Sequence, residues 1–93
     1  MKIVFPRYVL KRMIERRISV AEVRSVLESG DTIEYYQSDQ PPRYLVLGWS
    51  GKRPIHVVAE DDPISTETTV VTAYEPDRTI WKTGFKERKG VRK

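Results

Sequence analysis

The side chains in this sequence that could carry chemistry are one histidine and a few tyrosines and arginines. His56 is the only histidine, and there is no cysteine. An unperturbed imidazole has a pKa of about 6.5, so it can serve as an acid or a base near neutral pH. Arginine offers forked donors to a phosphate, and tyrosine can donate a proton or stack on a base. These types suit metal-independent cleavage of RNA, and the candidate catalytic residues are His56, Arg12, Tyr74 and Tyr8.

Each candidate also has a structural interpretation that stays open at this point. A lone histidine in a strand more often bonds a neighbour in the core than it performs catalysis. Arg12 could form a salt bridge with an acidic segment instead of binding phosphate. Trp49 and Trp81 are expected in the core, because buried indoles are more frequent than exposed stacking platforms.

Charge is segregated along the chain. Residues 1–17 carry a net charge of +5, residues 18–81 carry −6, and residues 82–93 carry +5. Basic ends of this kind favour a polyanionic partner through salt-dependent attraction. We therefore expect a polyanion as a partner, and if that polyanion is RNA, the candidate RNA-binding residues are Lys11, Arg16, Arg17, Lys82 and Lys86. The alternative is a solvated helix face and a basic tail without a ligand.

Length and composition limit the class of protein. A chain of 93 residues forms one domain with one core. No window approaches the roughly 20 apolar residues that span a bilayer, and the N-terminus becomes charged too soon for a signal peptide. We therefore expect a cytoplasmic protein with no membrane partner. One histidine and no cysteine predict neither a metal site nor a cofactor.

Two helices are expected near the N-terminus. The first runs over residues 7–16, and its apolar stripe consists of Val9, Leu10, Met13 and Ile14. The second begins after Ser19, because Ser19 and Glu22 have the spacing of a capping box. It ends at Gly30, which can take the left-handed conformation typical of a helix end.

The period of the apolar residues changes from that of a helix to that of a strand after residue 30. Strands are expected over residues 32–36, 43–49, 53–60 and 68–74. We predict an α+β fold in which two N-terminal helices pack on a four-stranded antiparallel meander. A three-residue loop at Gly51 is the preferred hairpin register, because it gives the helices one wholly apolar face to cover. His56 then lies on the opposite face. In that register one apolar face carries Leu45, Leu47, Ile55 and Val57.

The region after residue 74 is expected to lie largely outside the sheet. Trp81 is predicted to fold back onto an edge of the core. Residues 82–93 hold six basic residues and only Phe85 and Val91 to bury, so a mobile tail is expected. The predicted organisation is therefore one domain over residues 1–81 and a basic tail over residues 82–93.

Several short segments stand in a distinctive order along the chain. They are RMIERRIS (residues 12–19), LESG (27–30), LVLG (45–48), RPIHVV (53–58) and TAYEPD (72–77), together with Val23, Ile33, Glu34 and Trp81. Over residues 5–81 this series resembles the family catalogued as domain of unknown function 4258. That family looks like a relative of the RelE-type and BrnT-type toxins, in which helices pack on an antiparallel sheet.

The resemblance implies a toxin-like component of a bacterial or archaeal toxin–antitoxin pair, with RNA, ribosome-bound mRNA included, as its target and a cognate antitoxin as its partner. The sequence departs from the family at two positions. The family usually has a histidine where Tyr8 stands and a glycine where Arg17 stands. If that histidine is an acid or a base in other members, Tyr8 must act differently here or the activity is absent.

Two functions from different classes remain open. The first is a metal-independent endoribonuclease, which predicts that Arg12, His56 and Tyr74 share one open cleft. The second is a non-catalytic RNA- or protein-binding module of the same fold, which predicts dispersed basic residues and a buried or hydrogen-bonded His56. A third hypothesis is a structural protein that acts only by oligomerising through an exposed sheet edge, for example as a homodimer.

Overall fold

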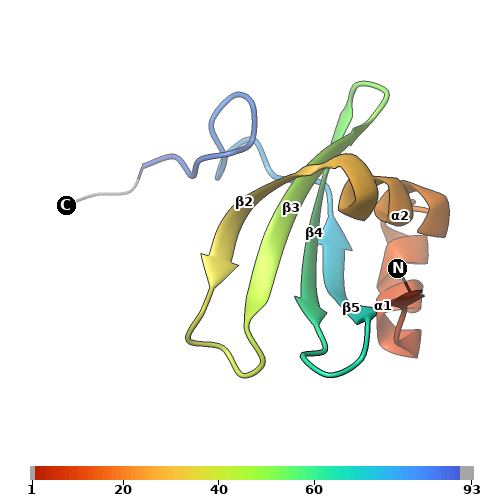
Figure 1. Ribbon diagram of the computed structural model, residues 1–93. Coiled ribbons are helices and arrows are strands. Elements are labelled where there is room, and N and C mark those ends of the chain that lie inside the picture. Colours follow the sequence, from red (N-terminus) through yellow and green to blue (C-terminus); the bar gives the residue numbers. More distant parts are fainter. Residues whose placement is uncertain (1, 91–93) are drawn as a thin grey trace.

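Residues 2–90 are described by a computed structural model, and they form two helices and one five-stranded sheet (Figure 1). In chain order the elements are β1 (Lys2–Val4), α1 (Arg7–Glu15), α2 (Val20–Ser29), β2 (Asp31–Tyr36), β3 (Arg43–Ser50), β4 (Arg53–Asp61) and β5 (Glu67–Tyr74). The order across the sheet is β1-β5-β4-β3-β2. The predicted α+β class with two helices is confirmed, and four of the strands form the predicted antiparallel meander.

The fifth strand, β1, was not predicted as part of the sheet. It has three residues and pairs in parallel with the start of β5, where Ile3 lies opposite Thr68. The sheet is therefore mixed, and the predicted four-stranded, wholly antiparallel sheet is wrong in this respect. Because β1 pairs with a strand that is distant in the sequence, no local sequence pattern predicts this pairing.

The two helices follow the sequence signals closely. In α1, Val9 and Met13 are buried against the sheet, whereas Ile14, which we placed on the same stripe, is 77% exposed. The capping box of α2 is present, since Ser19 Oγ accepts from the Glu22 N–H at 3.0 Å and the Ser19 N–H donates to Glu22 at 2.9 Å. No helix within residues 2–90 is long and apolar enough to cross a bilayer.

Gly30 ends α2 for a different reason from the one predicted. Its φ is −81°, so the backbone is not left-handed there. A Cβ at this position would lie only 2.5 Å from the carbonyl oxygen of Leu47 and 2.6 Å from that of Val26. Glycine is needed because α2 and β3 approach each other closely at this residue.

The loop between β3 and β4 has two residues, Gly51 and Lys52, instead of the predicted three. Gly51 has a φ of +63°, as short hairpin loops of this kind require. The shorter loop shifts the register by one residue, so that Leu47 lies opposite His56. The predicted grouping of residues 45, 47, 55 and 57 on one face is therefore wrong.

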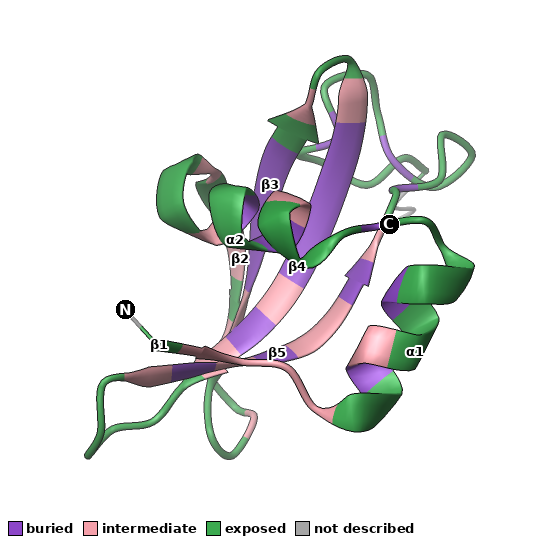
Figure 2. Ribbon diagram, turned by 90° about the vertical axis from the view of Figure 1, so that its right-hand side faces the viewer, coloured by how far each residue is buried: buried purple, intermediate pink, exposed green. Residues whose placement is uncertain are grey.

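Different parts of the chain cover the two faces of the sheet. Figure 1 shows the helices on one side and the segment after β5 on the other, and Figure 2 shows that the buried residues are concentrated in the strands between them. On the helix side the buried core consists of Val9, Met13, Ile18, Val23, Val26, Val46, Ile55, Val57, Val70 and Ala73. On the opposite side it consists of Leu45, Leu47, Trp81 and Phe85.

The segment of residues 77–90, called the C-terminal loop below, differs from the tail that we predicted. Trp81 is 4% exposed and Phe85 is 7% exposed, and both pack on the face of the sheet instead of an edge. Trp81 also forms an antiparallel bridge with Arg88. The packed domain therefore continues past residue 81, because the apolar second face of the sheet needs a cover. Residues 91–93, which we also assigned to the tail, lie outside the described residues.

Candidate functional site

His56 lies on β4 beneath the C-terminal loop, on the face predicted for it. Its side chain is fully buried, and both ring nitrogens have partners. Nε2 is 2.9 Å from the carbonyl oxygen of Phe85, and Nδ1 is 3.3 Å from the hydroxyl of Tyr74. A carbonyl oxygen can only accept, so Nε2 carries the proton and donates it to Phe85, while the Tyr74 hydroxyl donates to Nδ1.

Burial keeps both members of this pair uncharged. Removal from water lowers the pKa of His56 below its ordinary value, with smaller opposing effects from the Phe85 carbonyl and the Glu34 carboxylate. Burial also raises the pKa of Tyr74. At neutral pH His56 is therefore a neutral imidazole whose Nδ1 lone pair is already used, and it has no free site to take a proton from an RNA hydroxyl.

The other two predicted catalytic residues lie elsewhere. Arg12 and Tyr8 are on α1, which packs on the opposite side of the sheet, and both are exposed. Within residues 2–90 neither makes a hydrogen bond or an ion pair with His56 or Tyr74. The structure therefore brings together two of the four candidates and leaves two apart. The described residues also contain no cluster of three histidine or acidic side chains that could hold a metal ion.

The predicted RNA-binding residues near the N-terminus are partly engaged within the protein. Arg16 donates to the Ala73 carbonyl of β5 at 2.9 Å. The Arg17 carbonyl accepts from the Arg53 guanidinium at 2.7 Å, and this bond ties the end of α1 to β4. Lys11 is exposed on α1. These cations border the helix side of the molecule, away from the C-terminal loop.

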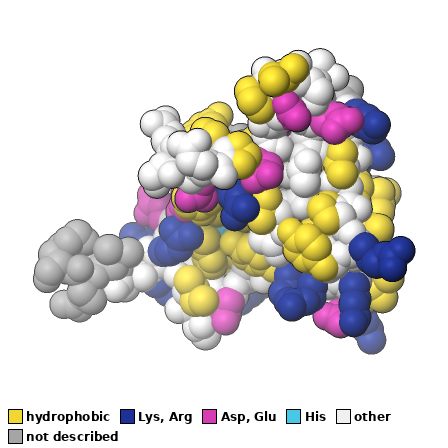
Figure 3. Space-filling view, turned by 90° about the horizontal axis from the view of Figure 1, so that it is seen from below, with side chains coloured by type: hydrophobic (Ala, Val, Ile, Leu, Met, Phe, Trp, Pro, Cys, Tyr) yellow, Lys and Arg dark blue, Asp and Glu magenta, His cyan; other side chains and the backbone are white. Residues whose placement is uncertain are grey.

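The predicted RNA-binding residues near the C-terminus lie on the C-terminal loop. Lys82 pairs with Glu87 at 3.3 Å, and Lys86 pairs with Asp31 of β2 at 3.3 Å. Figure 3 shows one end of the molecule, where Lys and Arg side chains gather in separate groups among acidic and hydrophobic ones. On the face that Figure 3 shows, the basic residues are thus dispersed, as the binding-module hypothesis predicts, and do not form one continuous surface.

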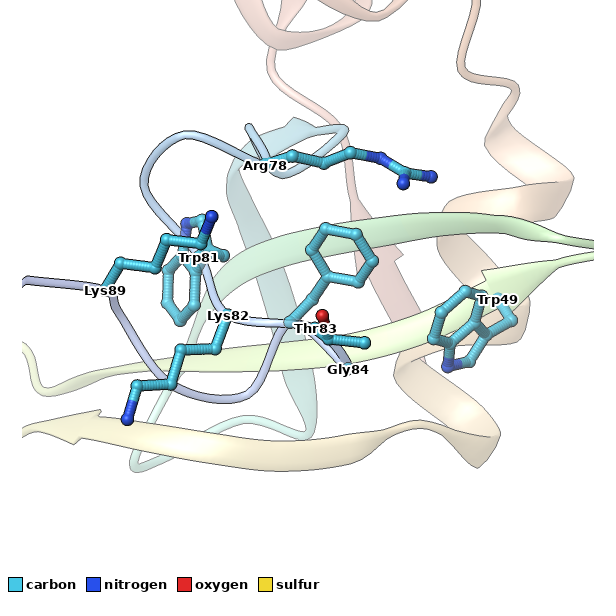
Figure 4. A pocket seen from close by; sticks show the side chains of 8 residues that line it. Trp49, Arg78, Trp81, Lys82, Thr83, Gly84 and Lys89 are labelled. Atoms are coloured by element: carbon cyan, nitrogen blue, oxygen red, sulfur yellow. The ribbon is translucent and has the colours of Figure 1, made fainter.

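A groove between β3 and the C-terminal loop is lined by aromatic and basic side chains. Its volume is about 370 Å³, and it is lined by Trp49, Arg78, Trp81, Lys82, Thr83, Gly84, Phe85 and Lys89. Figure 4 shows Trp49 at one end of the groove, Trp81 and Lys89 at the other, and Arg78 and Lys82 on either side. Binding sites for single-stranded nucleic acids have a similar composition, in which bases stack on aromatic side chains and phosphates contact cations.

The aromatic wall of the groove is formed by Trp49 and Phe85. Their rings lie edge to face with centroids 6.0 Å apart. The Arg78 guanidinium lies 5.8 Å from the centre of the Phe85 ring, within the range of a cation–π contact. Among the described residues, Arg78 and Lys89 have no acidic partner, so their charges are free to meet an anion.

Trp49 is the functional candidate that sequence reasoning missed. We expected it in the core, but it is 50% exposed. The signal that could have found it is its place at the end of β3, two residues after the buried Leu47 and on the same face. An aromatic ring at the end of a strand, on the same face as a core residue, lies at the edge of the core and remains partly exposed.

The fold and the groove define a small α+β domain with an aromatic and basic surface site. The family model described as Domain of unknown function (DUF4258) matches residues 7–75, and the chain belongs to this family. The predicted membership of this family is thereby confirmed over residues 7–75. No curated protein and no solved structure matches the chain.

The family match includes Trp49, His56 and Tyr74 but ends before the C-terminal loop. Trp81, which we counted in the resemblance, lies beyond it. Most of the side chains that line the groove therefore belong to the part of the chain outside the match.

Proposed function

We propose that this protein is a non-catalytic module that binds single-stranded RNA in the groove between β3 and the C-terminal loop. The observation that supports the proposal most directly is a half-exposed tryptophan at one end of a groove that also contains two cations, and neither cation has an acidic partner among residues 2–90. Trp49 provides a flat surface for one unpaired base. Arg78 and Lys89, which lie farther along the groove, would meet the phosphates of the strand that continues from that base.

The size and the chemistry of the groove fit this ligand. A volume of about 370 Å³ is at the lower end of the range of roughly 300–1,000 Å³ for ligand sites, which suits one nucleotide unit. A base in a duplex hides its faces in the helical stack, so only an unpaired base can lie on Trp49. The proposal therefore predicts a preference for single strands and little dependence on sequence.

The test is fluorescence anisotropy with a labelled oligouridylate of about ten nucleotides. We expect binding that weakens as salt is raised, because phosphate contacts release counterions. Trp49→Ala should weaken binding about tenfold or more, since one stacked base contributes roughly 1–3 kcal/mol. Arg78→Ala should weaken binding and also reduce its salt dependence.

Two matched controls are available at positions away from the groove. Tyr35→Ala removes an aromatic ring that is 67% exposed on β2, and Arg24→Ala removes an exposed cation of α2. Both should bind the oligouridylate as the wild type does. If Trp49→Ala and Tyr35→Ala had the same affinity, the groove would not be the site.

The ribonuclease function predicted from the sequence stays a prediction, and the contact between His56 and Tyr74 is the observation that favours it. For this activity the C-terminal loop would have to move away, because its Phe85 carbonyl occupies Nε2 of His56. The test is RNA integrity and growth after induced expression in a bacterium, with His56→Ala and Arg12→Ala at matched protein levels. RNA fragmentation that both substitutions abolish would support the enzyme and contradict the non-catalytic proposal.

The wider setting is proposed on the family resemblance. In that setting the protein is a cytoplasmic, RelE-like or BrnT-like toxin component that meets RNA and a cognate antitoxin. Co-purification with the product of a neighbouring small gene, followed by loss of oligouridylate binding in the complex, would support it. A homodimer is checked by light scattering of the purified protein.

A further inference from the structure

Phe85 has an unusual backbone conformation for a large aromatic residue. Its φ is +62°, in the left-handed region that residues with a Cβ avoid. The preceding Gly84 has a φ of +93°, so the chain takes two unusual values in succession. A strained residue of this kind persists only where its surroundings hold it in place.

Two hydrogen bonds hold the backbone of Phe85 from opposite sides. Its N–H donates to the Lys82 carbonyl at 2.8 Å, which closes a tight turn with Gly84 at the third position. Its carbonyl oxygen accepts from His56 Nε2 at 2.9 Å. The first bond is local to the loop, whereas the second attaches the loop to β4.

His56 is itself held firmly beneath the loop. The Tyr74 hydroxyl occupies Nδ1, and the Trp81 ring lies edge to face with the imidazole at 4.5 Å between centroids. Within residues 2–90 no buried side-chain nitrogen or oxygen lacks a partner. The imidazole is therefore a fixed donor aimed at one carbonyl, with little freedom to turn away.

The carbonyl that His56 holds belongs to the residue whose ring forms the wall of the groove. Phe85 contacts Trp49 and Arg78, as described above. If the Phe85 backbone relaxed to a negative φ, its Cβ direction would change and the ring would leave this position. The shape of the groove thus depends on a hydrogen bond formed underneath it.

We propose that His56 is a positioning residue that shapes the RNA-binding groove by holding the strained Phe85 through its carbonyl. This inference rests on the proposed RNA-binding function and adds a role for the buried histidine that requires no contact with RNA. The Nε2–H of His56 donates a hydrogen bond to the Phe85 carbonyl oxygen, and Nδ1 accepts a hydrogen bond from the Tyr74 hydroxyl.

The test compares two substitutions that differ in one property. The side-chain amide of His56→Gln can still donate to the Phe85 carbonyl, whereas the side chain of His56→Leu cannot. We expect His56→Gln to keep most of the affinity for the oligouridylate. His56→Leu should lose about tenfold or more, comparable to the loss of the stacked base. Both affinities are compared after urea unfolding has shown that each variant is folded under the assay conditions.

A second measurement needs no substitution, in case His56→Leu does not fold. Because His56 is the only histidine, nitrogen NMR of the imidazole reports its tautomer directly. The proposal requires a proton on Nε2 and a bare Nδ1 in the free protein, and the same state with the oligouridylate bound. A proton on Nδ1 instead, or loss of the Nε2 proton on binding, would overturn it.

The outcomes separate this inference from the proposed function. If the wild type does not bind the oligouridylate, RNA binding fails, and the role of His56 is then judged from the Trp49 indole resonances in the free protein. These resonances should shift in His56→Leu and stay near their wild-type positions in His56→Gln, because only the former releases Phe85. A folded His56→Leu variant with unchanged Trp49 resonances would refute the positioning role.

Discussion

The backbone N–H of Ile18 donates to the carbonyl oxygen of Met13 at 2.9 Å, just past the end of α1. With the bond from the Arg17 N–H to the Ile14 carbonyl at 3.1 Å, it forms a Schellman motif. The motif requires a left-handed residue at position 17, where the φ of Arg17 is +58°. This explains why glycine suits the position, and it means that Arg17 is under conformational strain.

We expect Arg17→Gly to raise the free energy of unfolding by up to about 1 kcal/mol, because glycine adopts a positive φ without the Cβ penalty. The measurement is urea unfolding monitored by circular dichroism. The control is Arg24→Gly, the same substitution at an exposed position inside α2. It should lower the free energy of unfolding by about 1 kcal/mol. Destabilisation by both substitutions would contradict the assignment of strain to Arg17.

The contact of α2 with β3 leads to a second prediction. A Cβ on Gly48 would lie 2.6 Å from Cγ2 of Val26, so no side chain fits between the helix and the strand. Gly48→Ala should lower the free energy of unfolding by about 1–3 kcal/mol through overpacking. Combined with Val26→Ala, the loss should be smaller than the sum by roughly 0.5 kcal/mol or more, because the added methyl group occupies space that the valine leaves. Strict additivity in urea unfolding would contradict this packing.

The lowered pKa of His56 gives a third prediction. The pKa is near 6.5 in the unfolded chain and lower in the folded protein, so the unfolded state binds the proton more readily. The contribution of His56 to the free energy of unfolding should therefore be fully present above about pH 6.5. It should be lost as the pH falls toward the pKa of His56 in the folded protein. The charged or titratable groups that face His56 are Tyr74 on β5, Glu34 on β2 and Arg88 on the C-terminal loop.

The measurement is the free energy of unfolding as a function of pH in wild type and in His56→Gln. The decline just below the unfolded pKa should disappear in the variant, which has no group that titrates there. Carboxyl groups whose pKa is lowered by hydrogen bonds act at more acidic pH, and they are Glu22, Asp62 and Asp77. Identical pH profiles for the two proteins would show that His56 is not buried as a neutral ring.

The ion pair between Glu34 and Arg88 gives a fourth prediction. Its atoms are 2.6 Å apart, and it fastens the C-terminal loop to β2. Glu34→Gln should lower the free energy of unfolding by up to about 1 kcal/mol, since the pair is partly shielded from water. Glu67→Gln, which breaks the more exposed pair with Lys2, should change it by a few tenths at most. Equal effects of the two in urea unfolding would contradict a special role for Glu34.

The helices and the extents of the four long strands could be predicted because their signals are local. The spacing of Ser19 and Glu22 placed the start of α2 at the correct residue. The hairpin register could not be predicted in the same way. Alternation sets a register only when one face of the strand is polar. Here the successive residues Leu45 and Val46 point to opposite faces of the sheet, and both are buried, so both faces are apolar.

The site was harder to predict than the fold, because its parts come together through the path of the C-terminal loop. The position of His56 on the face away from the helices followed from strand alternation. The groove could not be predicted from alternation, because Trp49 contacts Phe85 only after the C-terminal loop has folded back across the sheet. The C-terminal loop has so few apolar residues that its sequence resembles a mobile tail. It is packed because the second face of the sheet is apolar and needs a cover.

The pairing of β1 with β5 has a consequence for how the protein is made. The strand β1 has no neighbour in the sheet until residues 67–69 have also left the ribosome. The β3–β4 hairpin, closed by two residues, can form much earlier. Joining β1 to β5 closes nearly the whole domain into one long loop, a step that costs more chain entropy than any local pairing. We therefore expect this edge of the sheet to form last and to limit the folding rate.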